Sequence, residues 1–279
     1  MQTTAVRERE FTLSNAEFNE IRRLVREHTG IALSEAKREL VYSRLVRRLR
    51  RLSLHSFGDY LEILARGEPA ELEEFTNAIT TNLTAFFREA HHFEFLAETV
   101  LPQIERRNAA VRRLRIWSAG CSTGEEAYSI AIALQESMAR FRGWDVRILA
   151  TDLDSHVVAQ AQVGEYPVDR FEKVSAARRQ RWFEAPRAGI VAASPALKSL
   201  VTFRQLNLMH DWPFRGPFDV IFCRNVVIYF DKDTQRALFE RMAQLQRDGD
   251  HLFIGHSESL FRVCERYQPI GKTIYRKLR

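Results

Sequence analysis

The turn at residues 119–126 combines glycines with two adjacent acids, and reads AGCSTGEE after an apolar run. Gly120 and Gly124 allow the backbone to turn tightly and to lie close to a ligand. Ser122 and Thr123 each stand three residues before a glutamate, which fits a capping box, so we expect a helix to begin here. In a doubly wound α/β fold, a strand, turn and helix of this kind form a crevice for nucleotide-like ligands.

The two acids of this turn, Glu125 and Glu126, indicate the charge of the ligand. A phosphate favours an unobstructed helix amino terminus, and the full GxGxxG spacing is missing. Adjacent acids suit a cationic ligand, such as the ammonium and sulfonium groups of S-adenosylmethionine. Asp152, at the end of the next predicted strand, is placed to hold a ribose diol. From these elements alone the methyl donor, NAD and a plain loop with a helix cap all stay open.

These residues need a parallel sheet to position them. From about Val111 onward, short apolar runs alternate with helical patterns, which is typical of a doubly wound, mostly parallel α/β sheet with helices on both faces. The predicted strands are Leu114–Ser118, Val146–Thr151, Leu200–Gln205, Phe218–Cys223 and His251–Ile254, and the predicted helices are Glu125–Met138, Ser155–Gln162 and Lys232–Leu245. A stretch punctuated by Pro186, Gly189 and Pro195 breaks this alternation. We predict a small inserted antiparallel β-subdomain there, at about residues 178–203.

The part of the chain before this alternation predicts an all-helical domain. Ser14 with Glu17 fits a capping box, Gly30 ends the first helix, and Ser34 is placed to cap a second. We therefore expect a helical domain over residues 1–80 and an α/β domain over residues 81–279.

The formal net charge of +6 is concentrated in the second predicted helix. Residues 37–51 hold seven basic side chains and only one acid, Glu39. Four of the arginines fall largely off the apolar stripe of this helix, so we expect them to face outward: Arg44, Arg47, Arg48 and Arg51. Such a block suits an acidic partner, whether protein, nucleic acid or membrane surface, and a solvated helix face fits equally well.

Composition places the chain among ordinary globular proteins. No run approaches the roughly 20 apolar residues of a membrane helix, and residues 1–10 lack the apolar core of a signal peptide. The three cysteines form no CxxC pair and are expected to be reduced thiols. These features predict a cytoplasmic protein without membrane insertion.

Four sequence motifs make the prediction more specific. They are TNLTAFFRE at residues 81–89, WSAGCSTGEEAY at 117–128, FDVIFCRNVVIYF at 218–230 and FIGHSES at 253–259. In this order and spacing the chain resembles the CheR family, the chemotaxis-receptor glutamate methyltransferases, from about Ser14 to its end. The resemblance implies S-adenosylmethionine as methyl donor, S-adenosylhomocysteine as product, and methyl-accepting chemotaxis receptors as partners.

The resemblance also implies roles for individual residues. The positions expected to bind the cofactor are Asn82, Thr84, Arg88, Gly120, Glu125, Asp152, Asn207, Leu208, Arg224 and Asn225. Those expected next to the reacting groups are Arg88, Arg224, Asn225 and Tyr229. Arg88 or Arg224 is suited to hold a carboxylate through two parallel hydrogen bonds. Tyr229 fits the wall around the methyl group and equally well a core position.

The implied reaction is a single in-line displacement at the methyl carbon, which gives a glutamate methyl ester. A carboxylate is already ionised at neutral pH, so no general base is needed. Alignment and removal of water are the tasks left to the site. We therefore expect neither a catalytic triad nor a metal, and adjacent His91 and His92 are not expected to point at one site. His256 and Glu258 are predicted to belong to a structured loop near the site.

Substrate choice is expected to lie outside the cofactor turn. Receptor methylation regions are helical and rich in glutamate, so the outward arginines of residues 37–51 are predicted to bind them. Some family members dock a receptor pentapeptide on a glycine-bearing loop of the β-subdomain. The equivalent stretch here, residues 184–190, is about three residues shorter and has one glycine. We therefore predict methylation without pentapeptide tethering.

Other functions stay open at this point. A nucleic-acid or small-molecule methyltransferase fits the basic charge, although the chain lacks the Asn/Asp-Pro-Pro-Tyr string used on base amines, and we expect no nucleic-acid partner. A non-catalytic regulator that binds the cofactor or a signalling nucleotide is the alternative of a different class.

Overall fold

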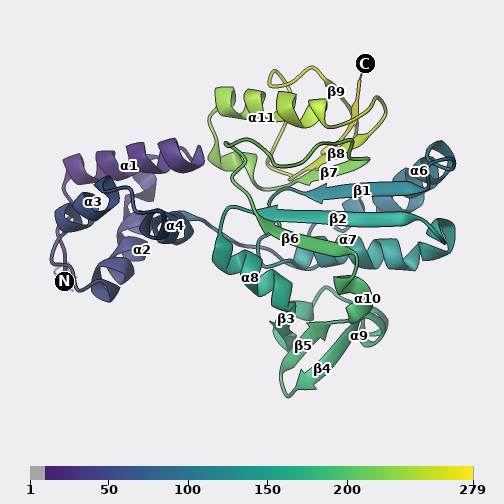
Figure 1. Cartoon of the computed structure of the whole chain (residues 1–279), viewed down its shortest axis with the longest axis horizontal. Helices are drawn as coiled ribbons and strands as arrows, with labels where there is room; N and C mark the ends of the chain where they lie inside the picture. The colour runs from purple at the N-terminus through teal and green to yellow at the C-terminus, as the bar shows by residue number, and fades with distance from the viewer. Residues whose placement is uncertain (1–9, 279) are drawn as a thin grey trace, which may run out of the picture. The chain divides into compact units, whose positions relative to one another are not determined.

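The computed structural model describes residues 10–278, and the chain divides between Thr80 and Thr81 into two compact units (Figure 1). The prediction about a signal peptide falls on residues 1–10 and therefore lies almost entirely outside the described part. No helix of the described part is long and apolar enough to cross a membrane.

The first unit is all-helical, as predicted. Its helices are α1 (Asn15–Thr29), α2 (Arg38–Arg51), α3 (Phe57–Ala65) and α4 (Pro69–Ile79), with a short 3-10 turn at Glu35–Lys37. Ser14 caps α1 through the predicted capping box, in which Glu17 accepts the Ser14 N–H at 2.8 Å. The predicted cap at Ser34 is wrong, because this residue precedes the 3-10 turn and its side chain makes no cap hydrogen bond.

The second unit is built on a seven-stranded sheet with the order β6-β2-β1-β7-β8-β10-β9. Its strands are β1 (Arg113–Ser118), β2 (Asp145–Asp152), β6 (Val201–Gln205), β7 (Val220–Cys223), β8 (His251–Ile254), β9 (Tyr267–Gly271) and β10 (Ile274–Lys277). The first five strands in this order, from β6 to β8, pair in parallel with their neighbours, and β10 pairs antiparallel with β8 and β9. The doubly wound, mostly parallel sheet is thus confirmed, and the β9–β10 hairpin is an addition that the sequence did not predict.

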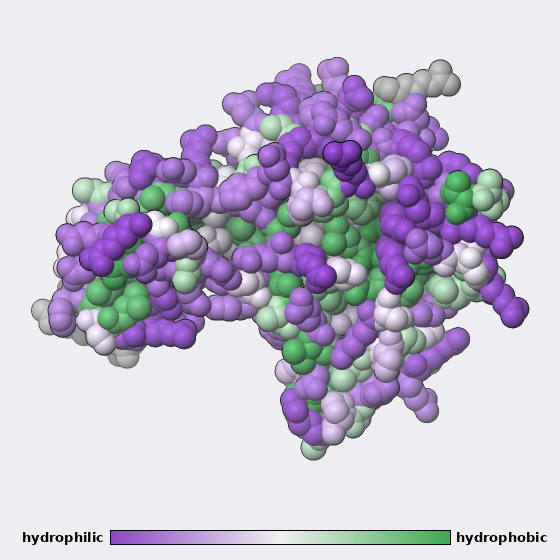
Figure 2. All heavy atoms as spheres, in the orientation of Figure 1, coloured by the Kyte–Doolittle hydropathy of each residue, from purple (hydrophilic) through white to green (hydrophobic). Residues whose placement is uncertain are grey.

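Helices cover both faces of this sheet (Figure 1). They are α5 (His91–Phe95), α6 (Leu101–Arg107), α7 (Glu125–Glu136), α8 (Ser155–Val163) and α11 (Lys232–Gln244), and a π-helical turn at Leu96–Val100 joins α5 to α6. Alternate strand residues point to opposite faces. Ile116 and Phe222 belong to the apolar cluster that includes α7, whereas Trp117 and Ile221 belong to the cluster that includes α11. On the face drawn in Figure 2, polar side chains cover most of the surface and apolar ones come through in patches.

The inserted subdomain is a three-stranded antiparallel sheet of order β3-β5-β4. Its strands are β3 (Glu165–Pro167), β4 (Phe183–Arg187) and β5 (Ile190–Ala193), and the helices α9 (Ala176–Trp182) and α10 (Pro195–Lys198) flank them. The predicted bounds of 178–203 need correction at both ends. Strand β3 begins the sheet at Glu165, and Val201 already belongs to β6 of the main sheet.

The strand order reverses between β1 and β7. From β1 the chain proceeds outward through β2 to β6, and it returns across β1 to add β7 and then β8 on the other side. A crevice opens at the carboxyl ends of the strands at such a switch point, and ligands bind there in open α/β sheets. The turn at residues 119–124 and the loop after Cys223 both lie at this place.

Candidate active site at the carboxyl ends of the parallel strands

The turn after β1 carries the backbone geometry that its glycines predict. Gly124 has φ +99° and stands directly before α7. A Cβ there would lie 2.8 Å from the Tyr166 hydroxyl, and a Cβ on Gly120 would lie 2.2 Å from Cγ2 of Val226. Both positions thus exclude a larger side chain. Gly120 also marks the point where the turn touches the loop after β7.

The predicted capping of α7 by Ser122 or Thr123 is wrong, because no side chain caps this helix. The Ser122 hydroxyl instead donates to the carbonyl of Asn82 at 2.9 Å. The Thr123 hydroxyl donates to Oε2 of Glu125 at 2.6 Å. The turn therefore binds the segment at residues 81–90, which we call the strap, and orients one of the two acids.

Asp152 lies at the end of β2 beside this turn. Its Oδ2 accepts the Ser122 N–H at 2.8 Å and its Oδ1 accepts the Asp154 N–H at 3.1 Å. These two donors fix the plane of the carboxylate. Burial raises the pKa of Asp152 to about 6.

The two acids at the start of α7 have different partners. Glu125 is fully buried, and its Oε1 lies 3.5 Å from Nη1 of Arg170, which comes from the inserted subdomain. Burial raises the pKa of both acids. Glu126 pairs with Nη1 of Arg224 at 3.0 Å and accepts from Ser118 at 2.7 Å. The expectation that both acids face a cationic ligand is therefore corrected for Glu126, which pairs with the enclosed Arg224, whereas Glu125 lies 3.5 Å from the exposed Arg170.

The strap carries three of the predicted cofactor residues. Nδ2 of Asn82 donates to Asp154 at 2.6 Å, and the Thr84 carbonyl lies 3.5 Å from Nη1 of Arg170. Arg88 is half-buried and donates to the Leu83 carbonyl at 2.9 Å. The bond from Ser122 to the Asn82 carbonyl and the bond from Asn82 to Asp154 hold the strap against the turns after β1 and β2.

The loop after β7 begins with Arg224, whose side chain is only 1% exposed. Besides Glu126, this guanidinium lies 3.5 Å from Glu89 and donates to the Arg88 carbonyl. Arg224 thus joins α7 to the strap. The expectation that it could hold a substrate carboxylate is corrected, because its side chain is enclosed by these partners.

Glu258 holds the same loop from the other side. Its carboxylate accepts the backbone N–H groups of Asn225, Val226 and Val227, each at 2.9 Å, and that of Gly255 at 2.5 Å. Asn225 has φ +58°, a conformation that needs such support. Glu258 is therefore a structured-loop residue, as predicted, and it sets the position of Asn225.

The other predicted site residues lie on neighbouring loops. Asn207 follows β6, and its Oδ1 accepts the Met209 N–H at 2.9 Å. Leu208 is buried there, and its carbonyl accepts from Arg241 at 2.8 Å. Tyr229 is half-buried in the 3-10 turn Val227–Tyr229, directly after the loop that Glu258 holds.

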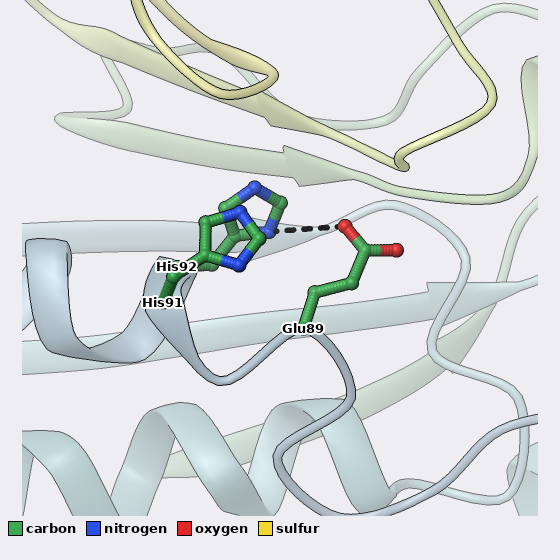
Figure 3. Close-up of side chains that lie close together, drawn as sticks. All are labelled: Glu89, His91 and His92. Atoms are coloured by element: carbon green, nitrogen blue, oxygen red, sulfur yellow. Dashed lines mark ion pairs between the residues drawn. The ribbon is translucent and has the colours of Figure 1, made fainter.

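Contrary to expectation, the adjacent histidines do point at one place. Their ring centroids are 4.3 Å apart, and Glu89 lies beside them (Figure 3). The expectation assumed a regular helix, but His91 is the first residue of α5, and Glu89 before it has φ +58°. The chain therefore turns sharply at Glu89 and brings its carboxylate back to the two imidazoles.

Within the helical unit, the four arginines of α2 divide into two pairs. Arg48 is 13% exposed and pairs with Glu71 and with Glu74, the latter at 3.1 Å. Arg44 donates to the carbonyls of Ile79 and Thr80. Only Arg47 and Arg51 are exposed. The expectation that all four face outward is corrected, because α4 packs on α2 and supplies acceptors for two of them.

Comparison with known proteins agrees with this arrangement over nearly the whole chain. Residues 16–80 match the model of the CheR methyltransferase all-alpha domain, and residues 82–276 match that of the CheR methyltransferase SAM binding domain. The chain belongs to the CheR methyltransferase family. The resemblance noted in the sequence is thus confirmed, and with it the S-adenosylmethionine-binding fold.

Several relatives of this family match along most of their length. Chemotaxis protein methyltransferase 2 of Pseudomonas aeruginosa is 47% identical over 270 residues, which cover 95% of this chain and 94% of that protein. The chemotaxis protein methyltransferase of Escherichia coli is 41% identical over 269 residues, covering 94% and 91%. Among solved structures, a geranyl diphosphate methyltransferase in complex with GPP and sinefungin aligns with 60% of this chain and 44% of its own, at 15% identity and a TM-score of 0.34.

Sequence reasoning missed two residues of this site. Glu89 is the last residue of the motif TNLTAFFRE but was assigned no role. An acid at the end of a motif that lies over the cofactor turn could have indicated a site residue. Arg170 carries no local signal, because it comes near Glu125 only through the packing of the inserted subdomain on the main sheet.

Proposed function

We propose that this CheR family member transfers a methyl group from S-adenosylmethionine to glutamate side chains of chemoreceptor cytoplasmic helices. The product is a glutamate methyl ester, which serves sensory adaptation. The observation that carries the proposal is that the turn after β1, Asp152 and the loop after β7 come together at the switch point of the sheet, where open α/β sheets bind their ligands. The relatives named chemotaxis protein methyltransferases support the choice of substrate class.

The residues of the crevice suit the methyl donor. Asp152 offers a carboxylate already oriented by two backbone amides, which suits the two hydroxyls of the ribose. Glu125, buried and beside a single guanidinium at 3.5 Å, suits the ammonium of the methionine part. Asn82, Thr84 and Arg88 on the strap would border that part, and Asn207 with Leu208 would border the adenine. The bound donor supplies an activated methyl group on a cationic sulfur.

The chain's own task in the transfer is to align the carboxylate and keep water away from it. The attacking carboxylate is ionised at neutral pH, so no residue has to remove a proton, and the transfer itself requires no metal. Arg224 acts as a positioning residue, because its enclosed guanidinium joins the strap to α7. Arg88 is the arginine left to orient a carboxylate, and Asn225 and Tyr229 would border the reacting methyl group.

The exposed arginines of α2 provide the substrate contact in this proposal. Arg47 and Arg51 would attract the glutamate-rich receptor helix, whereas Arg44 and Arg48 hold the helical unit together. The double variant R47E/R51E should methylate receptor fragments more slowly and bind S-adenosylhomocysteine normally. Unchanged methylation by this variant would remove α2 from substrate recognition.

We propose further that substrate recognition works without a receptor pentapeptide. The β4–β5 connection is a short turn through Ala188 and Gly189, although a groove of about 700 Å³ lies along the edge strand β4. Calorimetry with a pentapeptide from a receptor carboxyl terminus should give no heat of binding. Micromolar affinity would refute the idea. With this substrate class we also propose that the enzyme acts in the cytoplasm.

Labelled methyl donor distinguishes the proposal from the other functions. The chain is incubated with receptor cytoplasmic fragments and, separately, with RNA. Base-labile label on the receptor is expected, because methyl esters hydrolyse in alkali. Label on RNA, or no label on either, would refute the proposal in favour of a nucleic-acid methyltransferase or of a non-catalytic nucleotide-binding regulator.

A further inference from the structure

Three buried side-chain atoms beside the strap face one another without hydrogen-bond partners. They are Oε2 of Glu89, Nε2 of His91 and Nδ1 of His92. Each of these three residues offers a ligand atom that lies within 4.8 Å of those of the other two (Figure 3). Buried polar atoms are almost always satisfied by a protein group, a water or an ion, so three of them in one place mark a site that can take a ligand.

The hydrogen bonds around His92 settle which ring nitrogen is free to bind that ligand. Its Nε2 lies 2.9 Å from the Thr273 hydroxyl and 3.2 Å from the Lys272 carbonyl. The same hydroxyl donates to that carbonyl at 2.7 Å, so it must accept from the imidazole. Nε2 therefore carries the proton, and Nδ1 directs a lone pair at Glu89.

Glu89 is oriented in the same manner. Its other oxygen, Oε1, lies 3.0 Å from Nδ1 of His256 and accepts the His256 N–H at 3.3 Å. These contacts leave Oε2 directed toward the imidazoles, 3.7 Å from Nδ1 of His92. An imidazole and a carboxylate that are each oriented by outer hydrogen bonds are typical of metal sites.

The local charge permits a cation. Nη2 of Arg224 lies 3.5 Å from Oε2 of Glu89, and its positive charge opposes the binding of a cation there. Glu126, however, pairs with the same guanidinium at 3.0 Å. The two carboxylates and the guanidinium therefore sum to a charge of −1. A divalent cation would replace Arg224 as the partner of Oε2 and leave Arg224 its contact with Glu126.

From this geometry we infer that Glu89, His91 and His92 form a Zn²⁺ site. Zinc is commonly bound by two imidazoles and one carboxylate, with a fourth position left for water. Ca²⁺ and Mg²⁺ instead prefer oxygen ligands only. Metal–ligand bonds of about 2.0–2.1 Å place tetrahedral ligands about 3.3 Å apart, so Glu89 and His92 need only a small approach. The ion would tie the strap to the turn at residues 272–273 and takes no part in methyl transfer.

The test measures metal binding rather than activity, so its failure would leave the proposed function untouched. The full chain, stripped with a chelator, is titrated with Zn²⁺ against a chromophoric competitor and, separately, with Co²⁺ as a spectroscopic probe. One equivalent is expected to bind, with the visible absorption of four-coordinate Co²⁺ and a raised melting temperature.

Three variants make the assignment specific. His91→Ala should weaken binding at least tenfold, and Thr273→Val should weaken it by about 10–100-fold, because it removes only the outer hydrogen bond of His92. His55→Ala, which alters an exposed histidine of the helical unit, should bind like the wild type. No binding at micromolar Zn²⁺, or wild-type affinity in His91→Ala, would overturn the inference. The circular dichroism spectrum of each variant reports whether it is folded.

Discussion

Replacing Glu258 by glutamine tests how the loop after β7 is held. The carboxylate accepts backbone N–H groups on both oxygens, two on Oε1 from Val226 and Val227 and two on Oε2 from Asn225 and Gly255. In Glu258→Gln the amide oxygen can serve one of these pairs. The amide NH₂ group then faces the other pair, donor against donor.

The size of the effect follows from this count. Two buried N–H groups lose their acceptor, at about 1–3 kcal/mol each, which gives roughly 2–6 kcal/mol if the loop keeps its place. For a domain of about 200 residues, each kcal/mol of lost stability lowers the melting temperature by about 2–4 °C. The melting temperature of Glu258→Gln is therefore expected to decrease by at least about 4 °C. Movement of the loop would reduce this loss, but it would displace Asn225, and a misplacement of about 1 Å can cost roughly 10²-fold in rate.

The assay combines thermal unfolding with initial rates of receptor methylation. Glu265→Gln is the matched control, because this glutamate is exposed and the same charge is removed. It should stay near the wild type in both measurements. A Glu258→Gln variant with the melting temperature and the kcat/KM of the wild type would refute the argument that this carboxylate holds the loop.

Three further predictions concern other parts of the chain. The affinity for S-adenosylhomocysteine, measured by calorimetry between pH 5 and 8, should be highest near pH 8 and fall as the pH decreases through about 6. The ribose hydroxyls would donate to the ionised form of Asp152, whose pKa is raised to about 6, and Asp152→Asn should bind more weakly and without this pH dependence. Gly120→Ala should weaken cofactor binding, because the added methyl group would overlap with Val226. If the double variant G120A/V226A binds the cofactor as weakly as Gly120→Ala, this overlap is not the cause. Arg48→Met should destabilise the helical unit by about 3 kcal/mol in denaturant unfolding, since it removes the guanidinium that pairs with buried Glu71 and leaves this carboxylate its hydrogen bond from the Tyr60 hydroxyl. A loss of stability no greater than that of Arg47→Met would contradict the assignment.

Local patterns in the sequence predicted the elements of the fold well. Glycines, apolar runs and the box of Ser14 with Glu17 act between neighbouring residues, and they placed α1, the five parallel strands and the turn after β1. Strand β3 was missed because it is three residues long and ends in Pro167, so it offers neither an apolar run nor an alternation.

The partners of charged side chains could not be predicted, because they depend on contacts between distant segments. Ser122 looked like a helix cap, but its hydroxyl binds the strap 40 residues away. Glu126 looked free for a ligand, but Arg224 lies 98 residues further along the chain. Arg48 fell on the polar side of α2, and only the packing of α4 places Glu71 against it. A helical pattern shows which side of a helix is polar, but not which other element covers that side.

A crystal structure with S-adenosylhomocysteine would test most directly the claim that the crevice after β1 holds the methyl donor. We expect both ribose hydroxyls within hydrogen-bond distance of Asp152, and the ammonium of the amino acid part facing Glu125. The sulfur should point toward the loop at Arg224 and Asn225. A ligand bound elsewhere, or one whose ribose makes no contact with Asp152, would contradict this account.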